Sequence, residues 1–544
     1  MEEFSQLCCR IVEDAYGTFL AQIFRQLTQV GRLSINQVAQ KCRLPLRQVK
    51  TGMASLIQLR LVYHHTSPEG SSTYQANTSN AYNIMRTGRL IELVEWKFGS
   101  AGADIMEHLA VLGFATACEL EAHVLGHDDS SRLMDKSRFR ALLKHLITSK
   151  FILTVREAHF HSPFDSRQDA ERYLRGHGLL LQGTAKKIKI DGEAKVDAEL
   201  EHRLDGNISW PQVLHELEAN SSQANILLSV DYSNLILYTR NERVAEVAEK
   251  IFGRRTAEVA RAACLQLEDI DPRPLKLRLS DNPAGSLQRL DFSQMSHCIA
   301  SEGRPAMSNG QSNENGWLAG DKLLNGHQDY RANGTSGDHQ FIEYQLGLLA
   351  EGPFAFLLGD PVTRTWAIDK SKLNNFLWDK EMLRLIDESV SEPALRIVRM
   401  LADKGKLDER AMQDVGLLNA KELRKSLAQL QMKGFLELQE VPRDPQRQPK
   451  STTYLYFYDP ERVQKIFLDR LYKTMSRLYE RLHLERDKIS STLSKVERSD
   501  VQGSEEEILS PGELELLLRW RQKECWFMTE IHRIDASVAI LRDI

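Results

Sequence analysis

The sequence has 544 residues, of which 42% are hydrophobic and 27% charged, and its formal net charge is −4. At about 150 residues per domain, this length exceeds a single hydrophobic core and predicts about three to five modules. The small net charge excludes the strongly basic overall field that drives autonomous nucleic-acid binding, so any DNA contact must be local or shared with partners.

The seven cysteines are odd in number and form no CxxC pair, which fits a reducing compartment better than a disulfide framework. The opening MEEFSQLCCRIVEDAYG lacks the basic segment and long apolar run of a signal peptide. No apolar stretch approaches the ~18 residues of a membrane span. We therefore expect an intracellular, soluble protein.

The first predicted module, residues 1–80, ends in a helix that leads directly into an extended ribbon. The helix is apolar at Val49, Met53 and Leu56, which share one helical face. The extended segment LVYHHTSPEGSSTYQA follows with a polar turn, and Ser34 is a plausible N-cap for a short preceding helix. This order predicts the third helix and wing of a winged helix-turn-helix.

The same apolar spacing of i, i+4 and i+7 before an extended segment recurs three times. The second, third and fourth copies are Phe139, Leu143 and Leu146; Ile342, Leu346 and Leu349; and Leu423, Leu427 and Leu430. Any amphipathic helix has this spacing. Four matches that share the helix, a polar residue or helix breaker at i+11 (Arg60, Lys150, Pro353 and Gly434) and the extended segment favour a repeated module.

The predicted boundaries follow from these copies. Winged helix 2 is expected in 81–160, where FILTVREAHF would form its wing, and a polar linker in 161–206. Winged helix 3 is expected in 207–370, split by a disordered Gly/Asn/Ser-rich insertion at about 295–338. Winged helix 4 is expected in 371–459.

Residues 460–544 read as a C-terminal antiparallel coiled-coil hairpin rather than an ordinary helical domain. Asp459-Pro460 and Ser510-Pro511-Gly512-Glu513 are helix starts, and apolar residues follow at heptad spacing. The residues expected to form a partner-docking coiled coil are Leu468, Met475, Leu482, Ile489, Val496, Leu517, Met528, Ile531 and Val538. The predicted fold class is mainly α, with four tandem winged-helix domains, small β-wings and this hairpin.

The chain carries none of the short motifs that mark an enzyme. GxxxxGK[ST], GxGxxG behind a strand, GxSxG and HExxH are all absent from the sequence. We therefore predict a non-catalytic protein with no cofactor and no catalytic residues.

The histidines are expected to be solvated rather than metal ligands. His123 and His127 stand at i and i+4, but no third ligand is obvious beside them. The pairs His64-His65 and His159/His161 lie in wing-like segments and need no special role. No metal site is predicted.

Basic residues on the third helices and on the fourth wing are candidate contacts to DNA phosphate. For any one of them, a solvated helix face is the simpler interpretation, and nothing supports sequence-specific readout. The third copy differs, because Asp338, Glu343 and Glu351 make its helix acidic and suited to protein. The candidates are Arg47, Lys50, Arg138, Arg140, Lys144, Lys421, Arg424, Lys425, Arg443, Arg447 and Lys450.

Three stretches resemble a known family. EPALRIVRMLADKGKLDERAMQDVGLLNAKELRKSLAQLQMKGFLELQEVPRDPQRQPKSTTYLYFYD, LYTRNERVAEVAEKIFGRRTAEVARAACLQL and CRIVEDAYGTFLAQIFRQLTQVGRLSINQVAQ are similar to segments of the large winged-helix subunit of RNA polymerase III. The modules also resemble those of the large subunit of transcription factor IIE. The polymerase resemblance spans nearly the whole chain except the polar linker and the Gly/Asn/Ser-rich insertion.

The resemblance implies a nuclear, non-catalytic subunit of DNA-directed RNA polymerase III. It would dock on the polymerase clamp, bind two smaller subunits in a heterotrimeric initiation subcomplex, and help open promoter DNA at transfer RNA and 5S ribosomal RNA genes. Two alternatives remain: a winged-helix scaffold of another complex, such as a cullin-like or regulatory-particle protein, and a free DNA-binding regulator. The near-neutral charge and the acidic third copy count against the regulator.

Overall fold

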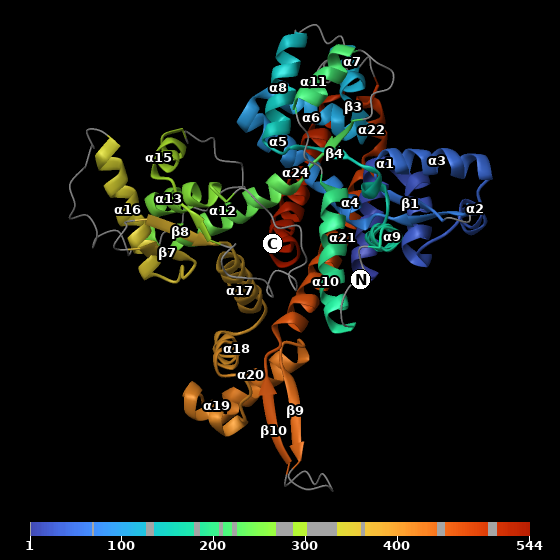
Figure 1. Ribbon diagram of the computed structural model, residues 1–544. Coiled ribbons are helices and arrows are strands. Elements are labelled where there is room, and N and C mark those ends of the chain that lie inside the picture. Colours follow the sequence, from blue (N-terminus) through green and yellow to red (C-terminus); the bar gives the residue numbers. More distant parts are fainter. Residues whose placement is uncertain are drawn as a thin grey trace. The chain divides into compact units, whose positions relative to one another are not determined.

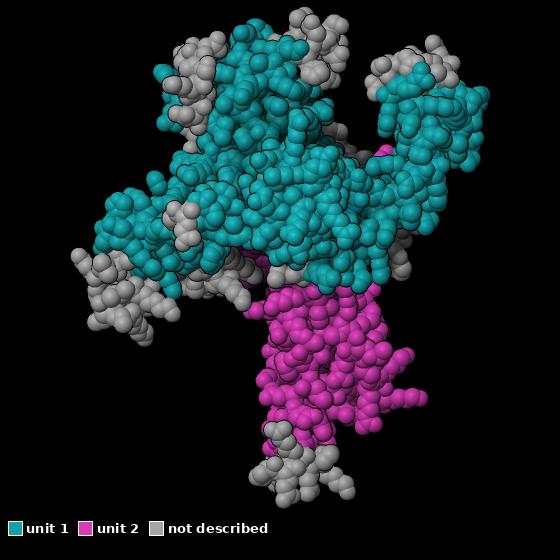
Figure 2. Space-filling view, turned by 90° about the vertical axis from the view of Figure 1, so that its right-hand side faces the viewer, with its two compact units in different colours: residues 1–235, 472–521 teal, residues 236–471, 522–544 magenta. Residues whose placement is uncertain are grey.

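The structure is a computed structural model that describes residues 2–67, 70–126, 135–178, 185–205, 210–219, 226–267, 287–301, 335–360, 365–442, 452–498 and 509–544. The chain divides into two compact units, coloured separately in Figure 2: unit 1 is 1–235 with 472–521, and unit 2 is 236–471 with 522–544. In the described residues, no helix combines the length and the apolar character that crossing a membrane requires.

The first winged helix forms as predicted (Figure 1). Its long first helix bends at Gly17, whose φ of +82° favours glycine. The backbone N–H of Ser34 donates to Gln37 Oε1 at 2.8 Å, which ties down the start of the second helix. Its elements are α1 (Glu2–Val30), α2 (Ile35–Cys42), α3 (Leu46–Gln58), β1 (Val62–Thr66) and β2 (Ser72–Ala76).

The second winged helix has a wing whose two strands are far apart in the sequence. The strand that follows its third helix pairs with a strand at 227–230, and not with the residues directly after it. Its elements are α4 (Thr78–Asn83), η1 (Ile84–Arg86), α5 (Thr87–Phe98), α6 (Ser100–Leu112), β3 (Phe114–Thr116), α7 (Ala117–Gly126), α8 (Lys136–Thr148), β4 (Ile152–Val155) and β5 (Leu227–Val230).

Two predictions about this region were wrong. The ribbon expected within 151–160 does not form, because the chain turns after Val155 into a 3-10 helix. The linker expected at 161–206 contains helices, the first of which starts where Ser162 Oγ accepts from the N–H of Asp165 at 3.3 Å. The segment between β4 and β5, which we call the wing-2 insertion, contains η2 (Glu157–Phe160), α9 (Pro163–Gly176), α10 (Ala185–Leu204) and α11 (Trp210–Ala219).

The disordered insertion predicted at about 295–338 in the third winged helix is helical at both of its ends. Residues 295–301 are helical, because Met295 is fully buried in the core of this module and Ile299 packs against that core. The rest of the predicted insertion up to 334 lies outside the described residues. The elements are α12 (Ser233–Phe252), α13 (Arg254–Leu265), β6 (Leu287–Arg289), α15 (Phe292–Ser301), α16 (Thr335–Glu351), β7 (Leu357–Asp360) and β8 (Thr365–Asp369).

The fourth winged helix follows the predicted order and has the longest strands. Asp408 caps its second helix by accepting from the N–H of Ala411 at 3.0 Å. Its elements are α17 (Lys370–Ser389), α18 (Glu392–Lys404), α19 (Glu409–Gly416), α20 (Ala420–Met432), β9 (Glu437–Pro442) and β10 (Thr452–Phe457).

All four modules share one strand topology. A short strand or bridge before the second helix pairs with the last strand of the wing: Leu33 with Tyr74, β3 with β5, β6 with β8, and Leu407 with Tyr456. The twelve apolar positions of the repeat are each at most 3% exposed. Burying such side chains stabilises each by about 1.5–3 kcal/mol, so the repeated spacing marks the inner face of every third helix.

The C-terminal segment is helical in both predicted arms, with one departure from prediction. Helix α21 ends at Lys488 because Ile489 is non-helical, at φ −116° and ψ 13°, before the poor helix formers Ser490 and Ser491. The first arm therefore consists of two helices instead of one. Its elements are α21 (Pro460–Lys488), α22 (Ser490–Val496), α24 (Pro511–Val538) and η4 (Ala539–Asp543).

Contacts between the arms run in opposite directions along the sequence. In unit 1, Lys495 pairs with Glu513, and the guanidinium of Arg486 lies 5.9 Å from the Trp520 ring centroid. In unit 2, Gln464 Nε2 donates to the carbonyl oxygen of Leu541. Residues farther along the first arm therefore contact residues earlier in the second arm, as in an antiparallel pair.

Candidate nucleic-acid and partner interfaces

The four third helices differ in the charge of their side chains. Helix α3 carries two basic and no acidic residues, and α8 carries four basic and none acidic. Helix α20 carries three basic and one acidic residue, whereas α16 carries three acidic residues and no lysine or arginine. Phosphate contact is therefore electrostatically favourable for α3, α8 and α20 and unfavourable for α16.

In the first module, the two predicted contacts are exposed on α3. Arg47 and Lys50 both lie on its outer face. Arg60, just beyond the helix, has a different role: its Nη1 donates to Ser229 Oγ on β5 at 3.1 Å. Burial lowers the pKa of Arg60. This side chain joins the first two winged helices and is not available to DNA.

The first two modules also contact each other at a second point. Gln58 Nε2 donates to the carbonyl oxygens of Leu112 and Phe114 at 3.0 and 2.7 Å. Gly113 lies between them with φ +78°, and a Cβ there would be only 2.2 Å from the backbone oxygen of Gln58. The two modules are thus joined by direct hydrogen bonds and close backbone packing within unit 1.

In the second module, Arg138 and Lys144 are exposed, whereas Arg140 is paired within the chain. Arg140 Nη2 lies 3.5 Å from Glu121 Oε2 of α7, whose carboxylate also lies 3.6 Å from Lys136 Nζ. The Glu121 side chain is only 11% exposed. Arg140 therefore braces α8 against α7, and Arg138 and Lys144 present the free charge.

The fourth module repeats this brace at the equivalent position of its third helix. Arg424 Nε donates to Glu409 Oε1 of α19 at 2.6 Å, with 71% of the arginine side chain exposed. Lys421 and Lys425 are exposed beside it. In the described residues, Arg47, Lys50, Arg138, Lys144, Lys421 and Lys425 form no ion pair. The predicted wing contacts Arg443, Arg447 and Lys450 lie outside those residues.

The predicted docking residues of the hairpin are largely buried within the chain itself. Met475, Leu482, Leu517, Ile531 and Val538 are at most 2% exposed. The positions that are only partly buried are Leu468, Ile489, Val496 and Met528.

The first arm packs on neighbouring modules. In unit 1, Tyr472 lies 4.8 Å from Phe4 between ring centroids, and Met475 Sδ lies 4.0 Å from the Tyr82 hydroxyl. In unit 2, Leu468 packs against the core of the fourth winged helix. Within each unit, these predicted docking residues therefore pack against the chain's own modules.

The two arms also carry exposed, large apolar side chains that heptad analysis did not single out. Leu484, Leu516, Leu518 and Trp526 are 46–56% exposed. Leu417, the C-cap of α19, and Met432, the last residue of α20, are 89% and 90% exposed. In the sequence, these residues differ from the buried apolar residues only because they fall outside the buried helical positions.

His123 is half-buried and not solvated as expected. Its ring lies 5.1 Å from that of His108 on the neighbouring α6, in an edge-to-face arrangement. Its predicted companion His127 lies outside the described residues.

Two family models match the chain at its first and last winged helices. Residues 6–67 match the RNA polymerase III subunit RPC82 helix-turn-helix domain, and residues 383–458 match the POLR3C C-terminal winged-helix domain. These ranges coincide with α1–β1 and with the fourth module.

Curated relatives match over nearly the whole length. The chain is 31% identical to DNA-directed RNA polymerase III subunit rpc3 of Aspergillus clavatus, covering 99% of both proteins. It is 30% identical to the proteins of the same name from Neosartorya fischeri and Aspergillus oryzae, covering 99% of this chain and 96% and 99% of theirs. The chain belongs to the DNA-directed RNA polymerase III subunit rpc3 family.

Proposed function

We propose that the chain acts in the nucleus as a non-catalytic subunit of RNA polymerase III, within a heterotrimeric subcomplex that helps open promoter DNA at genes for small RNAs such as transfer RNA and 5S ribosomal RNA. Similarity to rpc3 proteins along both complete lengths carries this proposal. The four modules act as rigid surfaces that hold other molecules in place.

The proposed DNA contact is nonspecific and lies on unit 1. Arg47 and Lys50 on α3 and Arg138 and Lys144 on α8 are exposed, and the two modules that carry them are joined by direct hydrogen bonds. Lysine and arginine side chains that neutralise phosphates release bound counterions, which gives affinity without base readout. Lys421 and Lys425 on α20 offer a similar surface in unit 2.

The proposed protein contacts use the acidic and apolar surfaces. The outer face of α16 would repel phosphate and suits a basic protein surface. Exposed apolar side chains on the hairpin and beside α20 suit the polymerase clamp and the two smaller subunits, because such residues anchor protein interfaces.

Purification of the tagged full-length chain from its own cells tests the assignment. We expect the polymerase and two smaller subunits to co-purify in constant ratio, and depletion of the chain to lower transfer RNA and 5S RNA synthesis. A matched variant, Trp526→Asp, should retain the fold while weakening co-purification, because it changes an exposed side chain.

Two results would contradict the proposal. One is recovery of the chain alone or with ubiquitin machinery, and the other is normal small-RNA synthesis after depletion. Loss of co-purification for the outward Lys523→Ala control as well as for Trp526→Asp would count against the apolar docking surface.

A further inference from the structure

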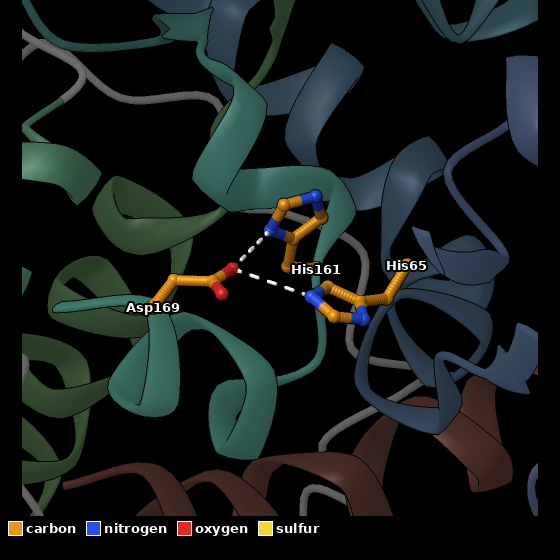
Figure 3. Close-up of side chains that lie close together, drawn as sticks. All are labelled: His65, His161 and Asp169. Carbon is orange, nitrogen blue, oxygen red and sulfur yellow. Dashed lines mark ion pairs between the residues drawn. The ribbon is translucent and has the colours of Figure 1, made fainter. Parts of the chain in front are cut away.

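Three side chains distant in sequence meet where the wing-2 insertion packs on the first winged helix. His65 comes from β1, His161 follows η2, and Asp169 lies on α9, all within unit 1. Figure 3 shows both imidazole rings and the carboxylate pointing toward one another. The nitrogen and oxygen atoms that each residue offers lie within 4.8 Å of one another.

We propose that His65, His161 and Asp169 bind one divalent transition-metal ion, Zn²⁺ first among them, that fastens the wing-2 insertion to the wing of the first module. Two imidazoles and a carboxylate are ligands that Zn²⁺ prefers, and water would complete a four-coordinate site. The proposed role is structural.

The measured spacings fit such an ion. His161 Nδ1 and His65 Nε2 lie 3.2 Å and 3.5 Å from Asp169 Oδ2. Ligand atoms about 2.0–2.1 Å from a tetrahedral Zn²⁺ lie about 3.3 Å from each other. The ion can therefore enter with small side-chain rotations.

The carboxylate is already oriented for this role. Arg172 Nη1 donates to Asp169 Oδ1 at 2.8 Å, which leaves Oδ2 facing the two imidazoles. Hydrogen bonds of this kind to the ligands of a metal fix their orientation. The side chains of His65, His161 and Asp169 are only 11%, 15% and 17% exposed, so the site is mostly shielded from bulk water.

The surrounding backbone holds the three residues in place independently of any ion. His65 is registered opposite Thr73 in the wing of the first module. Helix α9 is anchored to the same module by Arg32, whose Nη2 lies 2.5 Å from Asp165 Oδ2 and 3.3 Å from Ser162 Oγ. A site built before the ion arrives loses little conformational entropy on binding.

Metal content of the purified full-length chain is the direct test. After removal of metals with a chelator, dialysis against a small excess of ZnCl₂ should return one ion per chain. Replacement by Co²⁺ should produce the visible absorption of a low-coordinate site. Zn²⁺ should also raise the melting temperature of the stripped protein.

Variants separate a metal site from a simple hydrogen-bonded cluster. His161→Gln and Asp169→Asn should each weaken Zn²⁺ binding more than the ~10–100-fold typical of altering an outer partner. His145→Gln is the matched control, because His145 is an exposed histidine on α8 outside this group, and this variant should retain one ion. Circular dichroism of Asp169→Asn, which keeps the shape of the side chain, checks that the fold survives.

Substoichiometric Zn²⁺ in the wild-type chain would overturn the proposal, and so would equal binding by wild type and Asp169→Asn. In either case the imidazole N–H groups would simply donate to the carboxylate.

Discussion

Helices α8 and α16 both bury an apolar face, but their other residues carry opposite charge. Both bury an i, i+4, i+7 apolar set in the core of a winged helix, at no more than 1% exposure. Among their other residues, α8 has four basic ones, whereas α16 has three acidic ones and no lysine or arginine. The fold fixes only the inner positions, so the outer positions are free to match a binding partner.

The largest expected effect is on the inner faces, where the two helices should behave alike. Phe139→Ala in α8 should lower the free energy of unfolding by about 3–5 kcal/mol, and Leu346→Ala in α16 by about 2–5 kcal/mol, because both side chains are fully buried. Hydrogen exchange of each unit in the full-length chain measures the two losses separately.

Exposed neighbours are the controls for this comparison. Lys144→Ala and Gln340→Ala should change the unfolding free energy by no more than about 0.5 kcal/mol. If a buried variant changed the unfolding free energy as little as its exposed neighbour does, the two inner faces would not be equivalent.

The next effect is on DNA affinity, where the two helices should differ. Reversing two charges on α8, with Arg138→Glu and Lys144→Glu together, should weaken nonspecific duplex binding by about ten-fold or more. The slope of log affinity against log salt should fall by about two, because each phosphate contact contributes about 0.9. Fluorescence anisotropy over a salt series measures both.

The matched change on α16 is Glu343→Gln, which should leave the slope unchanged. Arg140→Ala should also have less effect than Arg138→Ala, because Arg140 is paired with Glu121. An unchanged slope for the double α8 variant would remove this helix from the DNA surface.

The smallest effect is a pH response of unit 1, to which α8 belongs. Burial lowers the pKa of His159 in the wing-2 insertion to about 4, and the charge of Arg60 acts in the same direction. Between pH 6.5 and about 4 the unfolded chain binds a proton here that the folded chain does not, so stability of unit 1 falls as pH falls through this window.

Melting curves of the full-length chain between pH 7 and 4.5 test this response. His159→Gln should flatten the pH dependence of unit 1, whereas His297→Gln, at an exposed position on α15, should not. Parallel pH profiles for wild type and His159→Gln would contradict the assignment.

Local periodicity was enough to predict the four third helices and three of the wings. Val49, Leu346 and Leu427 lie where helical spacing places them, because burial of one face determines that spacing. The wing of the second module was not predictable in this way. Its last strand, Leu227–Val230, has no local signal that ties it to Ile152–Val155.

For the candidate site residues, the sequence indicated the residue types but not the contacts that these side chains form. Arg140 and Arg424 read as phosphate ligands in the sequence, yet each is paired with a glutamate of the preceding helix. His65 and His161 were given no role, since their closeness to Asp169 depends on how the wing-2 insertion folds back. Proximity across such distances is a tertiary property.

The long separation of β5 from β4 along the chain has a consequence for folding kinetics. The β4–β5 connection, residues 156–226, is about fourteen times longer than the turn between β1 and β2, and closing it costs about 2 kcal/mol more in chain entropy. During synthesis, the strands of the first wing can pair as soon as residue 76 leaves the ribosome. The strands of the second wing can pair only after residue 230 has been made. Until then the edges of β3 and β4 stay open, and the growing chain is exposed to mispairing at this point.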